Sequence, residues 1–235
     1  MPTGLFGKLP AKRDFVAMNA PRRFLDAYEP WIQSGMATAR LRLGDGFAAT
    51  YNSAPLWRFW IGAELAGEAS IGVWMASVDG VGRSFPLTVM FSDGANAPPP
   101  PELDSNDEWF EAAEETLLGA LGEGATFDDL AIRVGALAAP RLKAAGDDAG
   151  AFRELDDGGV LLSDAAANWS LGFRAAGRYA QRRSLARQSF WWTLGGGAMP
   201  SLAFATPNWP GARRFEDFLT GRFDPQIQAP AGANA

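Results

Sequence analysis

The segment Leu56-Trp57-Arg58-Phe59-Trp60-Ile61 opens a run of three apolar stretches that decides the fold. The other two stretches are residues 69–77 (ASIGVWMAS) and residues 85–91 (FPLTVMF). Short stretches rich in aromatic and branched side chains, bounded by glycine-containing connections, predict β-strands. Because these connections are too short for a crossover helix, we expect the three strands to form antiparallel hairpins.

Segments with helical periodicity come before and after these three strands in the sequence. Residues 21–43 repeat apolar side chains at three- and four-residue spacing, which is typical of an amphipathic helix. Ser105 and Glu108 have the spacing of a capping box at the start of another helix. Further helices are expected at 126–134, 174–187 and 212–221, and further strands at 189–194 and 202–205. This order of elements predicts a layered α/β domain.

One domain is expected over residues 1–224. Residues 97–101 contain four consecutive prolines, which predict a stiff connector or a long surface loop. The aromatic strand at 189–194 lies beyond this connector and needs a sheet to join, which favours a single domain. Residues 225–235 are predicted to be a disordered tail.

The composition of the chain excludes several classes of chemistry. The 235 residues include no cysteine and no histidine, which excludes disulfides, thiol nucleophiles, Ser-His-Asp triads and His-ligated metals. The net charge of −6 is unlike the basic surface that nucleic-acid binding needs. We find no signal-peptide pattern and no apolar run near 20 residues, so we expect a cytoplasmic protein without membrane insertion.

A glycine-rich turn carries the most distinctive polar residues. The pair Asp79-Gly80 is a strong hairpin signal, and Gly82 permits a positive φ. Asp79 and Arg83 are expected to pair across this turn. The pair has two interpretations, because it either fixes the shape of the turn or binds an anion or a carboxylate.

Two adjacent tryptophans occur in the segment Ser189-Phe190-Trp191-Trp192-Thr193. Neighbouring residues of a strand point to opposite faces, so at least one of these indoles lies on the less buried face or under a helix. An exposed tryptophan would be a strong interface anchor. Burial between two layers is the alternative.

Charge is segregated along the chain. Between Glu102 and Asp129 there are ten acidic residues and no Lys or Arg. One interpretation is two solvated helix faces, either apart or facing each other, and the other is a docking surface that sets specificity. The opposite charge is carried by five arginines without an intervening acid: Arg174, Arg178, Arg182, Arg183 and Arg187.

Three motifs together resemble a known protein family. They are Phe6-Gly7-Lys8-Leu9-Pro10 continuing to Asp14-Phe15-Val16, then residues 77–87 (SVDGVGRSFPL), then residues 189–193 (SFWWT). In this order and at these separations they resemble the TagF (ImpM) family of type VI secretion accessory proteins. The resemblance implies a three-layer α/β/α sandwich around a largely antiparallel or mixed sheet. It also implies a cytoplasmic, non-enzymatic, post-translational repressor that binds a forkhead-associated scaffold protein.

The same motifs indicate a candidate interaction surface. We expect no catalytic residue, cofactor or metal. Two other functions stay open: a carboxylate- or metal-dependent phosphohydrolase, and a structural subunit of the secretion apparatus. The candidate surface residues are Lys8, Asp14, Ser77, Asp79, Arg83, Trp191 and Trp192.

Overall fold

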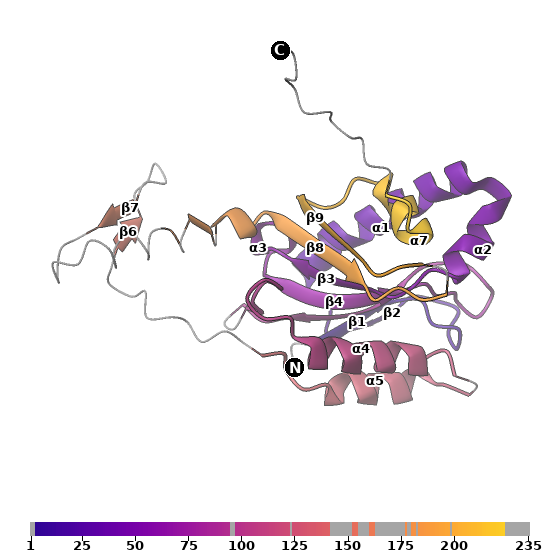
Figure 1. Cartoon of the computed structure of the whole chain (residues 1–235). Helices are drawn as coiled ribbons and strands as arrows, with labels where there is room; N and C mark the ends of the chain where they lie inside the picture. The colour runs from indigo at the N-terminus through magenta and orange to yellow at the C-terminus, as the bar shows by residue number, and fades with distance from the viewer. Residues whose placement is uncertain are drawn as a thin grey trace, which may run out of the picture.

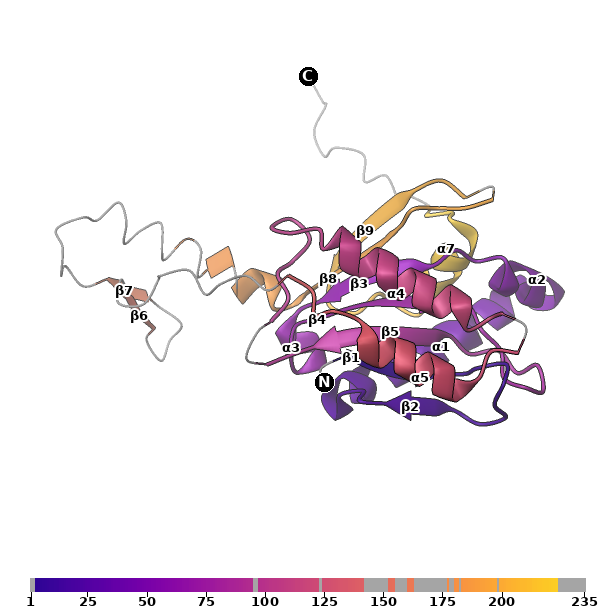
Figure 2. The same ribbon diagram turned by 90° about the horizontal axis from the view of Figure 1, so that it is seen from below.

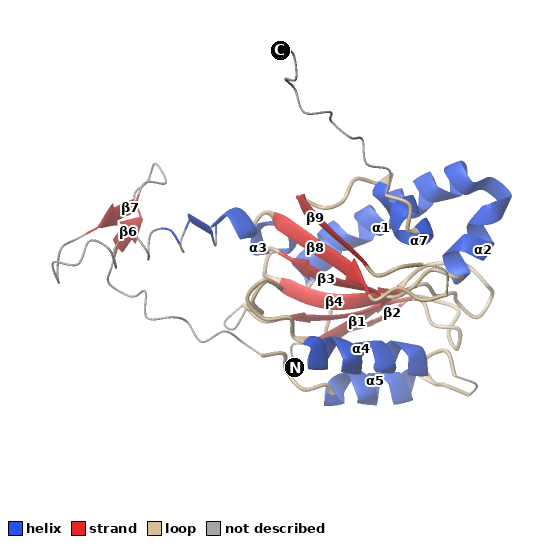
Figure 3. Cartoon of the chain, viewed as in Figure 1, coloured by secondary structure: helices blue, strands red, loops and turns tan. Residues whose placement is uncertain are grey.

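The centre of the computed structural model is an antiparallel sheet (Figures 1 and 3). The structure describes residues 3–94, 97–122, 124–141, 152–154, 160–162, 177, 180–181, 183–197 and 199–223. Within these ranges seven strands pair in the order β2-β1-β5-β4-β3-β8-β9, and every pairing is antiparallel. The strands are β1 (Thr3–Gly7), β2 (Val16–Met18), β3 (Trp57–Ile61), β4 (Ser70–Met75), β5 (Leu87–Ser92), β8 (Gln188–Thr193) and β9 (Leu202–Pro207). A separate antiparallel pair is formed by β6 (Phe152–Glu154) and β7 (Val160–Leu162).

Helices lie against both faces of the seven-stranded sheet. Figure 1 shows α1, α2 and α7 on one face, and Figure 2 shows α4 and α5 across the other. The predicted α/β class and the antiparallel pairing of the central strands are therefore confirmed. The helix bounds are α1 (Arg22–Leu43), α2 (Phe47–Asn52), α3 (Ala63–Ala66), α4 (Asp107–Gly119), α5 (Phe127–Ala136) and α7 (Arg214–Thr220), with a 3₁₀ turn η1 (Gly44–Gly46).

The position of β3 in the sheet explains why its sequence is apolar at every residue except Arg58. Its side chains alternate between the two faces, and both faces are covered, so neither set of positions can be polar without a partner. Trp57 and Phe59 join the core beneath α1 and α7. Trp60 joins the core beneath α4 and α5, and its indole N–H donates to the carbonyl of Pro98 at 3.0 Å.

The proline run does not separate two sheets. The strand β8, which follows the run in the sequence, pairs with β3, which precedes it, through the register Phe59↔Trp191 and Trp60↔Phe190. The expectation that the aromatic strand near residue 190 joins the central sheet is confirmed. The predicted tail at 225–235 lies outside the described residues, as do Arg174, Arg178 and Arg182 of the arginine-rich segment.

The predicted capping box at the start of α4 is wrong. The helix begins one residue later than expected, with Asn106 as its N-cap in the left-handed conformation (φ 50°, ψ 33°). The Ser105 hydroxyl donates instead to the Asp107 carboxylate at 2.6 Å, and the Asp104 carboxylate accepts the Asn106 N–H at 2.9 Å. The Asp107 carboxylate thus diverts the Ser105 hydroxyl from a capping role, and the Asp104 carboxylate binds the backbone N–H of Asn106.

The acidic helix α4 binds a buried arginine of the sheet. Arg58 on β3 is only 2% exposed, and its Nε and Nη2 donate to the two oxygens of Glu114 at 2.7 and 2.9 Å. Its Nη1 donates to Asp107 at 3.2 Å, and the guanidinium lies 5.4 Å from the Phe110 ring centroid. Burial acts to lower the pKa of Arg58, but these carboxylates raise it above its ordinary value. The interpretation of the acidic segment as a solvated helix face is therefore wrong for Glu114.

This ion pair leads to a stability prediction. Glu114→Gln keeps the size of the side chain but leaves the buried Arg58 charge only partly compensated, so we expect the free energy of unfolding to fall by about 3 kcal/mol. Glu115→Gln, at an exposed position of the same helix, should change it by less than about 0.5 kcal/mol. Urea denaturation measures both. Equal effects of the two substitutions would contradict the role given to Glu114.

Candidate functional site

The direction of two strands brings the first two sequence motifs together. Both β1 and β4 pair antiparallel with β5, which lies between them, so β1 and β4 run in the same direction. Their carboxyl ends therefore lie at the same edge of the sheet. Lys8 follows β1 at this edge, and Ser77 and Asp79 follow β4. We call the two connected loops, residues 8–15 and 77–85, the two-loop platform.

The carboxylate of Asp79 is the centre of the platform. Its side chain has no exposed surface, yet it is surrounded by donors. Oδ2 accepts from Lys8 Nζ at 3.0 Å and from Arg83 Nε at 2.6 Å. Oδ1 accepts from the backbone N–H of Arg83 at 2.9 Å and of Val81 at 3.1 Å. The predicted Asp79–Arg83 pair is confirmed, and it shapes the turn.

These donors keep Asp79 ionised. Removal from water raises the pKa of a carboxyl group, but the backbone N–H of Arg83, the Lys8 ammonium, the Arg83 guanidinium and the Val81 N–H outweigh that effect. Together they hold the pKa of Asp79 well below its usual range. The carboxylate is a fixed anion that orients the chain around it.

Backbone hydrogen bonds join the two loops of the platform. The Gly80 N–H donates to the Lys12 carbonyl at 2.7 Å, and Arg83 Nη2 donates to the Arg13 carbonyl at 2.6 Å. The Ser77 hydroxyl donates to the Lys8 carbonyl at 2.8 Å. A Cβ at Gly80 would lie 3.0 Å from the Pro10 carbonyl oxygen, so a side chain there would press on the first loop. The platform is consequently held together at several points along both loops.

Four of the seven sequence-predicted residues gather in the platform core: Lys8, Ser77, Asp79 and Arg83. Asp14 does not join them. It is exposed, and its carboxylate has no ion pair or hydrogen bond with the described residues. Arg83 contacts this loop through the backbone carbonyl of Arg13 instead.

The two tryptophans lie away from the platform. They are on β8, two strand positions from β4, or about 10 Å across the sheet. The indole of Trp191 is buried in the core under α1 and α7, so it offers no accessible surface in this structure. Trp192 faces the α4 side, 4.8 Å from the Phe110 ring centroid, and borders a largely apolar hollow of about 550 Å³ beside β9. The expectation that the two indoles point to opposite faces is confirmed.

Sequence reasoning missed two exposed apolar residues of the platform. Phe15 is 46% exposed and Val81 is 57% exposed. Phe15 packs edge-on against Phe85 at 4.7 Å between ring centroids, and the Lys8 ammonium lies 5.2 Å from the Phe15 centroid. The glycines on both sides of Val81 could have indicated its exposure, whereas Phe15 lies directly before the apolar Val16 and looks like a core residue in the sequence.

The described residues contain neither a cluster that could hold a metal ion nor a helix that could span a membrane. In these ranges no group of three or more acidic side chains is arranged to hold a metal ion. None of the helices placed by the structure combines the length and apolar character that a bilayer span requires.

Comparisons with known proteins agree with the motifs. The sequence profile of the TagF N-terminal domain, described as type VI secretion system-associated, matches residues 4–137. The chain belongs to the TagF family. Among solved structures, this TagF chain is similar to the crystal structure of PA0076 from Pseudomonas aeruginosa PAO1, with 30% sequence identity and a TM-score of 0.75. The alignment covers 94% of this chain and 96% of that chain. A search of curated proteins gave no match for this TagF chain.

The depressed pKa of Asp79 predicts how stability depends on pH. A carboxyl group whose pKa is lowered by folding stabilises the folded state above its unfolded pKa of about 3.9 and loses that contribution as the pH falls towards its folded pKa. Wild-type stability in urea should therefore fall below about pH 4 more steeply than that of Asp79→Asn, whose amide takes up no proton in this range.

The matched control for this experiment is Asp14→Asn. This substitution also removes a carboxylate from the platform, but one without partners among the described residues. It should reproduce the wild-type curve. If Asp79→Asn and wild type lost stability in parallel between about pH 5 and pH 2, the stabilising role of the Asp79 charge would be refuted.

Proposed function

We propose that this TagF chain is a cytoplasmic, non-enzymatic regulator that represses type VI secretion after translation by binding a forkhead-associated scaffold protein. The two-loop platform is the observation that carries the proposal. In this proposal the fold is a three-layer α/β/α sandwich. Helices α1, α2 and α7 form one outer layer, and α4 and α5 form the other. The platform then lies at one edge of the central sheet.

The first support is the rigidity of the platform. The Asp79 carboxylate accepts four hydrogen bonds or ion pairs, and three more hydrogen bonds cross between the loops. A surface that is already ordered loses little conformational entropy when a partner binds. The internal contacts thus favour recognition of another macromolecule by a fixed shape.

The second support is the chemistry of the exposed part of the platform. The platform exposes the cationic side chains of Lys12, Arg13 and Arg83 as well as the apolar side chains of Phe15 and Val81. Arginine and aromatic residues are enriched among the side chains that dominate binding energy. This local positive charge contrasts with the net charge of −6 of the whole chain. It favours a partner surface that is acidic and carries an apolar side chain.

The third support concerns the chemistry that the platform is unsuited to perform. A general base works best with a pKa near the operating pH, whereas the pKa of Asp79 is held far below neutrality. Both of its oxygens are already occupied by donors. Its arrangement is that of a structural anion, which supports a binding role for the platform.

Repression would then follow from mass action. The ratio of regulator-bound scaffold to free scaffold equals the free regulator concentration divided by its Kd, and only the free scaffold can enter assembly. No covalent step is required. The strength of repression is set by the amount of the protein and by the affinity of the platform.

Charge and shape at the platform can be changed without disturbing its internal contacts. Arg13→Glu and Val81→Asp alter exposed side chains, and Arg83, Lys8 and Asp79 are left intact. Each substitution should weaken binding of the purified scaffold by at least about tenfold in isothermal titration calorimetry. The control is Arg23→Glu, an exposed arginine in the first turn of α1. It lies at the opposite edge of the sheet, because β2 runs back from the platform before α1 begins.

The outcomes distinguish a wrong binding surface from a wrong function. If wild-type protein binds the scaffold and all three variants bind equally well, the scaffold contact lies elsewhere. If wild type does not bind the scaffold at all, the repressor proposal fails. Recovery of only sheath or baseplate proteins in a pull-down from a lysate that contains the scaffold would favour a structural subunit instead.

A further inference from the structure

A groove on the α4 side of the sheet lies open beside the edge strand β9. Figure 2 shows β9 beyond α4 on this face, and β9 is the last strand in the sheet order. Two residues of β9, Ala203 and Ala205, are exposed here and pair with Trp192 and Phe190 of β8. The apolar hollow of about 550 Å³ lies over these four residues and Leu194. We call this space, with the five residues as its floor and α4 as its wall, the α4–β9 groove.

The floor of the groove is apolar and accessible. Phe190, Trp192 and Leu194 occupy alternate positions along the chain, so they point to the same side. Leu194 is 61% exposed, and Phe190 and Trp192 are half-buried. Exposed aromatic and aliphatic side chains that gather in one hollow are typical of a surface that binds another protein.

The wall of the groove is acidic. Asp107, Glu111 and Glu114 recur at four- and three-residue spacing, so they share one flank of α4. Arg58 shows where this flank points, because its guanidinium binds Asp107 and Glu114. Arg58 also pairs across the sheet with Trp192, so the flank faces the floor of the groove. Three carboxylates beside one buried guanidinium leave a net negative charge along the wall.

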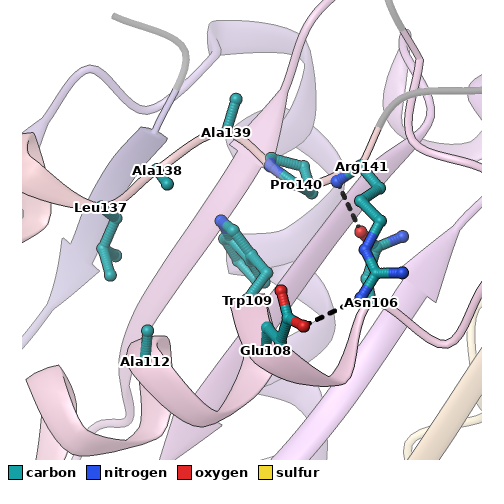
Figure 4. Close-up of a pocket in the computed structure, with 9 residues that line it drawn as sticks. All are labelled: Asn106, Glu108, Trp109, Ala112, Leu137, Ala138, Ala139, Pro140 and Arg141. Carbon is teal, nitrogen blue, oxygen red and sulfur yellow. Dashed lines mark hydrogen bonds and ion pairs between the residues drawn. The ribbon is translucent and has the colours of Figure 1, made fainter.

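The opposite flank of α4 is closed by this chain itself. Figure 4 shows Glu108 and Ala112 on the side of α4 that faces residues 137–141, with a cavity of only about 110 Å³ in between. Glu108 pairs there with Arg141 at 3.1 Å. The flank that carries Glu111 is therefore the one with room for a further element.

The dimensions of the groove suit one helix. Two neighbouring strands span about 10 Å, which is the diameter of a helix with its side chains. Figure 2 shows α4 and α5 on this face, and a helix over β8 and β9 would continue their layer. An extended segment on the face of a sheet finds no backbone partner, whereas a helix pairs its own N–H and C=O groups.

We propose that the α4–β9 groove binds a cationic amphipathic helix of a partner protein. The apolar face of this helix lies on Trp192 and Leu194, and its basic side chains pair with Asp107 and Glu111. Charge complementarity selects this partner, because residues 102–129 contain ten acids and no Lys or Arg. The site is separate from scaffold binding, since none of its residues belongs to the two-loop platform.

The test uses a fluorescein-labelled synthetic helix of about 18 residues built from Leu and Lys, with Leu at three- and four-residue spacing. The full chain is titrated into this peptide, and fluorescence anisotropy reports binding. We expect a Kd in the micromolar range. A peptide with Glu in place of every Lys should bind at least about tenfold more weakly, because the wall repels it.

Two pairs of variants, matched in charge, separate the groove from attraction by the net charge of −6. Glu111→Gln should weaken binding of the Leu/Lys helix by about threefold, whereas Asp128→Asn, an exposed change on α5, should not. Ala205→Arg fills the floor with a cation and should weaken binding by at least about tenfold. Its control is Thr206→Arg, which adds the same charge to the other face of β9. Circular dichroism checks that each variant is folded.

Three results would overturn this proposal. The first is that wild type does not bind the Leu/Lys helix, as expected if another part of this chain or a second copy fills the groove. The second is equal affinity for the Leu/Glu peptide. The third is that Glu111→Gln and Ala205→Arg bind as tightly as their matched controls, which would mean that the helix binds elsewhere on the acidic surface.

Discussion

The carboxylate of Asp79 is charged but has no exposed surface, so donors within the protein must compensate its charge. The conformation of both loops at that edge of the sheet depends on these donors. The donors come from two loops whose positions in the sequence are far apart, at Lys8 and at Val81 and Arg83. A single side chain thus specifies both the turn after β4 and the loop after β1. Without the parallel directions of these two strands, Lys8 would emerge at the other end of the sheet, and Asp79 would lose one of its two cationic partners.

Arg58 presents the same problem with the opposite sign. A cation in the middle of an aromatic strand can be buried only if acids approach from the covering layer, and α4 supplies Glu114 and Asp107. This requirement fixes α4 along the sheet more specifically than apolar packing does, because a bidentate pair tolerates little displacement. The two buried charges therefore orient different layers: Asp79 orders the loops at the edge, and Arg58 positions a helix over the face.

The sequence predicts local features of this molecule well and long-range ones poorly. The central strands follow from apolar runs that are covered on both faces, and the Asp79–Arg83 pair follows from a glycine turn of four residues. Lys8 entered the candidate set through the family motif, since its contact with Asp79 depends on strand order. The Arg58–Glu114 pair was missed for the same reason, because no local pattern tells which helix will cover β3. The N-cap of α4 was misplaced because the Asp107 carboxylate binds the Ser105 hydroxyl and the Asp104 carboxylate binds the N–H of Asn106.

The strand order also determines when the sheet can be finished during synthesis. β3 ends at Ile61, but its second neighbour, β8, begins only at Gln188. While the intervening chain is being made, β1 to β5 can pair, and β3 remains an open edge with unpaired backbone groups and aromatic side chains. Such an edge is a template for association with other chains. The nascent protein therefore passes through a long interval in which its most aromatic strand is unprotected, and it leaves this interval only when the last quarter of the chain reaches the sheet.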